Sequence, residues 1–138
     1  MNATPTVLRY NYRIYPTPGQ RIELAKAFGC ARVVFNDCIR FRQESHASGV
    51  KVSDTDVQKR VVTAAKATPE RGWLAEVSSV VLVQACQDAR VAYRNFFDSL
   101  SGKRKGRKMG APRFRSRKDN RQAIRLTRNG FSLRPNGK

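Results

Sequence analysis

The sequence predicts an α+β fold in which a bundle of helices lies between an N-terminal strand and a C-terminal β-hairpin. Apolar residues alternate with polar ones over residues 6–15, and they recur at spacings of three and four over residues 24–39 and 82–100. Near the end of the chain, Asn129-Gly130 separates two short alternating runs. A period of two is typical of a half-buried strand, and a period near 3.6 is typical of an amphipathic helix. The length of 138 residues is about that of one ordinary domain.

The start of the chain combines the predicted strand with a helix start. Residues 6–15 form the strand, and Pro16 ends it. Thr17 is then expected to cap a helix, because its side chain can accept a backbone N–H, and Gln20 can close a capping box. The proline between them suits the first helical position. The apolar stripe that follows predicts a helix to about Gln43.

Two further helices are expected in the middle of the chain. A second, shorter helix is predicted by the helical spacing of Val57, Val61 and Ala64 or Ala65. Ser78 is expected to cap a third helix that continues until Gly102 ends it. The stripes of the three helices can bury one another. Four phenylalanines on these stripes are assigned to the core: Phe28, Phe35, Phe96 and Phe97.

The positive charge is concentrated in the last quarter of the chain. The formal net charge is +18, and residues 102–138 hold 14 of the 28 Lys and Arg but one of the ten acids. Such a segment repels itself, and a polyanion relieves the repulsion when Lys and Arg replace the counterions of its phosphates. Nucleic acid is therefore the first partner to consider. The predicted phosphate-binding residues are Lys103, Arg104, Lys105, Arg107, Lys108, Arg113, Arg115, Arg117, Lys118, Arg121 and Arg125.

A hairpin is predicted where this basic segment ends. Asn-Gly favours a tight hairpin turn, because both central positions need a positive φ. Its two strands and the N-terminal strand would make a small sheet with open edges, which proteins normally pair or blunt. We therefore expect the chain to be the front part of a longer protein, with a natural end at Lys138 as the alternative.

The sequence suggests neither a metal site nor a membrane segment. Cys30, Cys38 and Cys86 form no CxxC pair, and the single histidine, His46, is distant in sequence, so the cysteines are interpreted as small apolar residues on helix faces. No apolar run approaches the roughly 18 to 20 residues of a membrane span, and the first ten residues lack a signal-peptide core. A cytoplasmic protein is expected.

Five blocks of the sequence, spread across nearly the whole chain, carry a resemblance: residues 12–20 (YRIYPTPGQ), 29–36 (GCARVVFN), 73–79 (WLAEVSS), 93–97 (YRNFF) and 110–116 (GAPRFRS). In this order they resemble the N-terminal region of the TnpB (OrfB) family of insertion-sequence proteins. The resemblance implies a first strand of a β-barrel wedge domain at residues 1–16 and a helix-turn-helix-like recognition domain at residues 17–102. A basic linker and hairpin at residues 103–138 would return the chain to the incomplete barrel.

The same resemblance implies a transposon-encoded, RNA-guided DNA endonuclease related to type V CRISPR effectors, with guide RNA and double-stranded target DNA as partners. Its catalytic trio of carboxylates with two divalent metal ions such as Mg²⁺, and its zinc ribbon, would follow the region present here. The acids of this chain suggest no convergent trio of the kind that two-metal cleavage needs. We therefore expect a segment that binds nucleic acid and does not cut it, with no cofactor of its own.

Six residues are candidates for contacts to bases. In the resembled family, the start of the third helix and the hairpin lie beside the short motif that flanks the DNA target, where Ser79, Gln84, Thr127 and Arg128 could reach base edges. Ser79 is equally an ordinary capping residue, and Gln84 an ordinary exposed one. Tyr15 and Phe114 could stack on bases or pack in the core.

Two other classes of protein stay open. One is a free-standing helix-turn-helix DNA-binding regulator or transposase accessory protein. Against it, that motif joins two short helices by a turn of about three to four residues, whereas the connections expected here are long. The other is a structural RNA-binding protein of ribosomal type, which also combines a high isoelectric point with basic tails.

Overall fold

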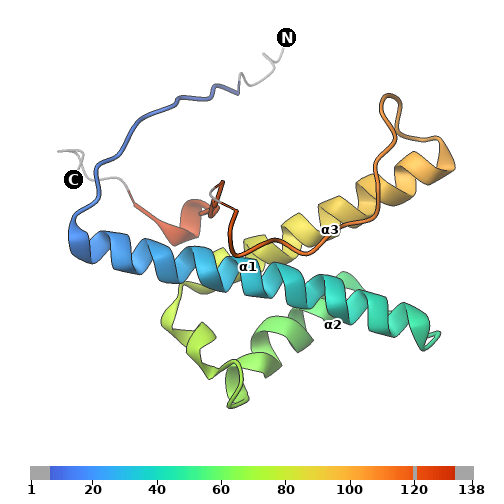
Figure 1. Cartoon of the computed structure of the whole chain (residues 1–138), viewed down its shortest axis with the longest axis horizontal. Coiled ribbons are helices and arrows are strands. Elements are labelled where there is room, and N and C mark those ends of the chain that lie inside the picture. Colours follow the sequence, from blue (N-terminus) through green and yellow to red (C-terminus); the bar gives the residue numbers. More distant parts are fainter. Residues whose placement is uncertain (1–6, 120, 133–138) are drawn as a thin grey trace, which may run out of the picture.

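The computed structural model describes residues 7–119 and 121–132, and over these residues the fold is helical (Figure 1). Two long helices, α1 (Pro18–Ala47) and α3 (Ser79–Ser101), pack across each other. The short α2 (Asp54–Gln58) lies on one side of this pair. A π-helical stretch (Lys59–Ala64) and short 3-10 segments (Ala65–Ala67 and Gly72–Glu76) connect α2 to α3. In the described part of the chain, no helix is long and apolar enough to cross a bilayer.

The N-terminus of α1 has the capping box that the sequence predicts. Thr17 Oγ1 accepts the Gln20 N–H at 3.3 Å, and Gln20 Oε1 accepts the Thr17 N–H at 2.8 Å. These bonds satisfy backbone donors that have no partner within the helix. The helix continues one turn beyond the predicted end near Gln43, to Ala47. At the end of α3, Gly102 adopts the left-handed conformation with φ of 81°, so the predicted stop is confirmed.

The core lies where α1 and α3 cross. The helix α2 and the segments after it pack against this crossing and cover one side of the core. Small side chains at the crossing let the helices approach closely, so that Cys38 Sγ of α1 lies 3.4 Å from Cys86 Sγ of α3. All three cysteines are buried free thiols, as expected for small apolar residues on helix faces. The buried residues at the centre are Val34, Phe35, Cys38, Ile39, Val57, Val61, Val62, Leu74, Val81, Leu82, Ala85, Cys86 and Ala89.

The predicted N-terminal strand is wrong for the described residues 7–15. This segment is extended, but no other segment pairs with it and its apolar side chains are exposed: Tyr12, for example, is 81% exposed. An alternating sequence becomes a strand only when a neighbouring strand takes its backbone hydrogen bonds and one face is covered. Residues 1–6 lie outside the described residues.

The predicted hairpin is also wrong. Arg128–Gly130 form a single 3-10 turn, and the Gly130 N–H bonds to the Thr127 carbonyl at 2.7 Å. Gly130 does not have the positive φ that an Asn-Gly hairpin turn needs. The absence of a side chain at Gly130 instead allows the turn to lie close to the first turn of α3. A Cβ at this position would lie 3.0 Å from Val80 Cγ1. The expected second strand extends into residues 133–134, which are outside the described residues.

The α+β prediction, with parts of a β-barrel wedge domain at either end, is therefore replaced by a helical fold. The described part of the chain contains no strand. The helices that were expected between the β elements are present, two long and one short. The division of the chain at residues 16 and 102 stays a prediction.

After α3, the chain turns back and runs along the two long helices (Figure 1). We call residues 103–108 the basic loop and residues 109–128 the return segment. The Arg104 N–H bonds to the Asp98 carbonyl at 3.1 Å, and the Met109 N–H bonds to Ser99 Oγ at 3.0 Å. These two bonds fix both ends of the basic loop to the last turns of α3.

Candidate nucleic-acid interface

The return segment is attached to α1 through the side chain of Asn36. Asn36 Nδ2 donates to the Arg115 carbonyl at 3.1 Å, and the Arg115 N–H donates to Asn36 Oδ1 at 2.7 Å. A carboxamide that satisfies both backbone groups of one residue imitates the pairing of a neighbouring strand. The segment is thereby held along the helix.

Cation–aromatic contacts on either side of this attachment interlock helix and segment. The Arg115 guanidinium lies 3.8 Å from the ring centroid of Phe35 on α1. In the second contact the cation comes from α1 and the ring from the return segment: the Arg40 guanidinium lies 5.9 Å from the ring centroid of Phe114. Such contacts contribute about 0.5–1 kcal/mol each at exposed sites. Phe114 remains half exposed, so its predicted stacking on a base stays a prediction.

A groove of about 590 Å³ lies between α1, α3 and the return segment. Four arginines line it: Arg32 from α1 and Arg115, Arg121 and Arg125 from the return segment. Asp88 and Asp119 also line the groove, and Asp88 Oδ1 lies 3.4 Å from Arg125 Nη1. The four arginines outnumber the two acids, so the groove carries a positive balance.

The predicted phosphate-binding residues are all exposed. Every one of the eleven, from Lys103 to Arg125, has an exposed side chain. Among the described residues, Arg125 is the one member of this set that pairs with a carboxylate. Five cations of the set are in the basic loop, and the others follow the return segment across the two helices. The structure thus presents these exposed cations on a segment whose backbone is held to α1 by Asn36 and to α3 by Ser99.

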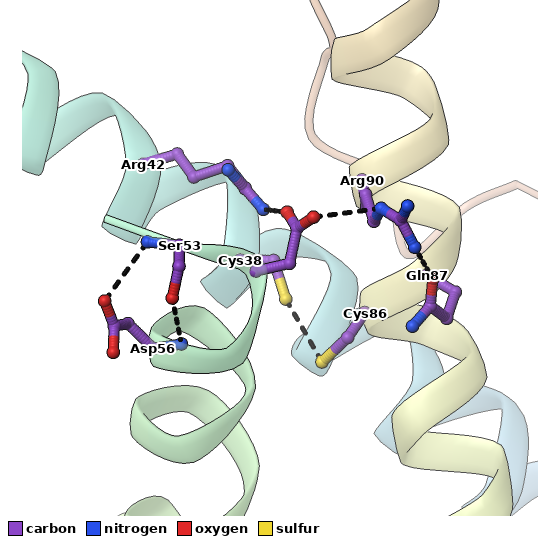
Figure 2. A network of polar contacts seen from close by, with 8 residues as sticks. Cys38, Arg42, Ser53, Asp56, Cys86, Gln87 and Arg90 are labelled. Carbon is purple, nitrogen blue, oxygen red and sulfur yellow. Dashed lines mark hydrogen bonds and ion pairs between the residues drawn. The ribbon is translucent and has the colours of Figure 1, made fainter. Parts of the chain in front are cut away.

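Several other arginines are bound within the helical body. Asp54, the first residue of α2, accepts a hydrogen bond from Arg42 of α1 and forms an ion pair with Arg90 of α3, whose Nε lies 2.9 Å from Asp54 Oδ2 (Figure 2). It thereby links all three helices. Asp37 pairs with Arg71 Nε at 2.9 Å, and this bond raises the pKa of the guanidinium. Neither Arg42 nor Arg71 has a free charge to offer a ligand.

The candidates for base contacts are only partly brought together. Gln84 is half buried, and with Arg115 and Arg125 it lines a small cavity of about 70 Å³ beside the main groove. Ser79 is exposed in the first turn of α3. Thr127 and Arg128 are exposed at the 3-10 turn that contacts this helix, and their contacts to bases stay a prediction. Tyr15 instead lies beside the first turns of α1 and lines a different pocket.

Sequence reasoning missed the contribution of α1. Phe28, Arg32, Asn36 and Arg40 are spaced by four residues, so they form one row along the helix. The return segment lies antiparallel to this row, because Phe114 contacts Arg40, Arg115 bonds to Asn36, and Ser116 lines the groove with Phe28 and Arg32. The spacing was visible in the sequence and could have signalled a helix face that receives another segment.

The described residues do not form a metal site. Over residues 7–119 and 121–132, no three His, Cys, Asp or Glu side chains gather where an ion could bind. The donor set of the described residues therefore does not fit the divalent ions or the zinc that the family resemblance implies.

Comparisons with known proteins point to one family. Residues 6–51 match the model of a helix-turn-helix domain, that of OrfB proteins of the IS605 type. The chain is also 34% identical over 125 residues to a protein of Streptomyces pristinaespiralis named "Putative RNA-guided DNA endonuclease". Both findings confirm the resemblance to TnpB (OrfB) proteins. The match covers 91% of this chain and 29% of that relative, so the chain spans under a third of the relative's length.

The TnpB-like helix-turn-helix region departs from the compact motif that its name suggests. Over its described residues 7–51, α1 is the one helix, and it runs uninterrupted for 30 residues. Six residues, 48–53, separate α1 from α2. A motif of two short helices joined by a tight turn is thus not the arrangement found here.

Proposed function

We propose that this chain is a nucleic-acid-binding portion of a TnpB-like, RNA-guided DNA endonuclease, and that it positions guide RNA and target DNA without cleaving them. The observation that carries the proposal is the run of exposed cations on the basic loop and return segment, anchored to α1 by Asn36 and to α3 by Ser99. An anchored backbone presents its charges in fixed positions, which lowers the ordering cost of binding a polyanion. The name of the Streptomyces relative supports the same partners.

The chemistry of the exposed residues suits phosphate groups. Arginine offers a planar fork of donors that matches phosphate oxygens, and lysine offers a compact point charge. Phosphate contacts fix the position of a protein on a nucleic acid without reading its sequence. The proposed role is therefore to hold the nucleic acid in register on the helical body.

The test is the salt dependence of binding. Each phosphate contact contributes about 0.9 to the slope of log K against log salt for duplex DNA and about 0.7 for a single strand. Glutamine at Lys103, Lys105, Lys108, Arg104 and Arg107 should reduce the slope on duplex DNA by up to about 4.5. Fluorescence anisotropy with labelled RNA and DNA, between about 50 and 200 mM salt, measures it.

A matched control changes the same number of exposed cations elsewhere. Glutamine at Arg9, Arg21, Lys26, Lys59 and Arg60 lowers the net charge equally but leaves the basic loop and return segment intact. If both variants reduce the slope equally, net charge alone drives binding and the proposed surface is wrong. Tight, salt-insensitive binding to a palindromic duplex would instead favour a free-standing regulator.

A further inference from the structure

A second groove lies near the C-terminal end of α3, and its most prominent wall is aromatic. Tyr93, Phe96 and Phe97 line this groove of about 660 Å³. The loop after α1, residues 50–52, and Pro112 at the start of the return segment form other parts of the lining. The volume lies within the range of about 300–1,000 Å³ that is usual for small-molecule sites.

The three rings are arranged as a platform. The ring centroids of Phe96 and Phe97 are 5.4 Å apart with planes inclined by 16°, and those of Tyr93 and Phe97 are 6.1 Å apart with planes inclined by 25°. Phe97 is 57% exposed, although its helical spacing had assigned it to the core. With this exposure, Phe97 is accessible for contact with another flat ring.

Lys51 brings a positive charge to the lining of the groove. Arg42 and His46 also line it, and among its described lining residues none is acidic. Arg42 is bound to Asp54, and its guanidinium lies 5.5 Å from the Tyr93 ring, so it supports the platform. Lys51 is exposed. The basic loop is fixed to α3 at Asp98 and Ser99, which directly follow Phe97 in the helix.

We propose that this groove binds an unpaired nucleobase of single-stranded RNA or DNA, stacked on Phe97, while Lys51 and the basic loop bind the flanking phosphates. Aromatic faces flanked by cations suit single strands, because every base has a flat face and every nucleotide a phosphate. A base within a duplex is already stacked and cannot enter. The positive surroundings favour this ligand over an apolar segment of a protein. The inference rests on the proposed function and assigns to it a site for bases.

The test compares oligonucleotides with and without bases. Thymidine, uridine and abasic oligonucleotides of about 12 nucleotides fall within the usual site sizes of roughly 4 to 16. Phe97→Leu keeps most of the apolar volume but removes the aromatic face. It should weaken binding of the thymidine and uridine oligonucleotides roughly 5- to 150-fold, the range for losing one stacked base, and leave binding of the abasic one unchanged.

Two control variants accompany this experiment. Phe97→Tyr retains the flat face and should retain affinity. Phe131→Leu changes another exposed phenylalanine, 51% exposed, which does not line the groove, and should have no effect. Circular dichroism melting of each variant checks that the helices remain folded. In the unaltered protein, an oligonucleotide that carries 2-aminopurine gives an independent readout, since stacking on Phe97 should quench its fluorescence.

The possible results separate this inference from the function on which it rests. If Phe97→Leu loses affinity equally for oligonucleotides with and without bases, or loses none for either, base stacking on Phe97 is overturned. The proposed phosphate binding is unaffected by either result. Full affinity of Phe97→Leu together with unquenched 2-aminopurine would mean that another partner covers the platform. Failure of every oligonucleotide and duplex to bind at low salt overturns both proposals.

Discussion

Replacement of Asn36 by alanine removes both hydrogen bonds between α1 and the backbone of Arg115. A net hydrogen bond contributes about 0.5–1.5 kcal/mol. Because these two bonds are exposed, we expect the lower part of the combined range, about 1–2 kcal/mol, for docking of the return segment. One to two kcal/mol corresponds to a factor of roughly 5–30 in a two-state equilibrium. The cation–π contacts of Arg115 and Arg40 remain in the variant.

Amide hydrogen exchange at Arg115 reports this equilibrium directly, because its N–H is the donor of the shorter of the two bonds, at 2.7 Å. Its exchange should accelerate roughly 5- to 30-fold in Asn36→Ala, while amides in the middle of α1 and α3 should keep their protection. Asn95→Ala is the matched control, because Asn95 lines the same groove from α3. The reasoning is refuted if the Arg115 amide exchanges equally fast in the unaltered chain and in Asn36→Ala.

Three further results are expected. Leu82→Ala, at a fully buried position, should lower the free energy of unfolding in urea by about 2–5 kcal/mol, whereas the exposed Ile22→Ala should change it by less than about 0.5 kcal/mol. Hydrogen bonds from Ser53 lower the pKa of Asp56 in the folded chain. The stabilising effect of the Asp56 carboxylate should therefore be present above the pKa that this group has in the unfolded chain. It should be lost as pH falls through the lower pKa that the group has in the folded chain. Asp56→Ala should accordingly destabilise the chain at pH 7 and have little effect in strong acid, which urea titrations at the two pH values measure. The hydrogen bond with Cys86 and burial raise the pKa of Cys38, so iodoacetamide should alkylate this thiol in urea but not in the native chain, as mass spectrometry would detect.

The helices were predictable because their signals are local. Thr17 and Gln20 lie within one turn of each other, and Gly102 directly follows the helix that it ends. Neither feature needs information from a distant part of the chain. The strand and hairpin failed for the opposite reason. Alternation over residues 7–15 and the Asn-Gly pair have meaning only when another strand is available, and the described chain supplies none.

The candidate site was predictable in composition and only partly in geometry. Charge alone identified the basic loop and the cations of the return segment. Arg32 and Asn36 were missed because their role depends on a segment 79 residues from Asn36 lying along α1. Phe97 was misassigned because helical spacing says which residues share a face, but not how far along the helix that face remains covered.

The anchoring of the return segment would also couple the proposed nucleic-acid binding to folding. The cations of the return segment keep this arrangement only while α1 and α3 are folded. A nucleic acid that binds the arrangement would therefore stabilise the folded state. By mass action, a ligand at 100 times its dissociation constant adds about 2.7 kcal/mol to the stability of the state that binds it. Preparations that retain cellular RNA should therefore melt at a higher temperature than preparations from which RNA has been stripped.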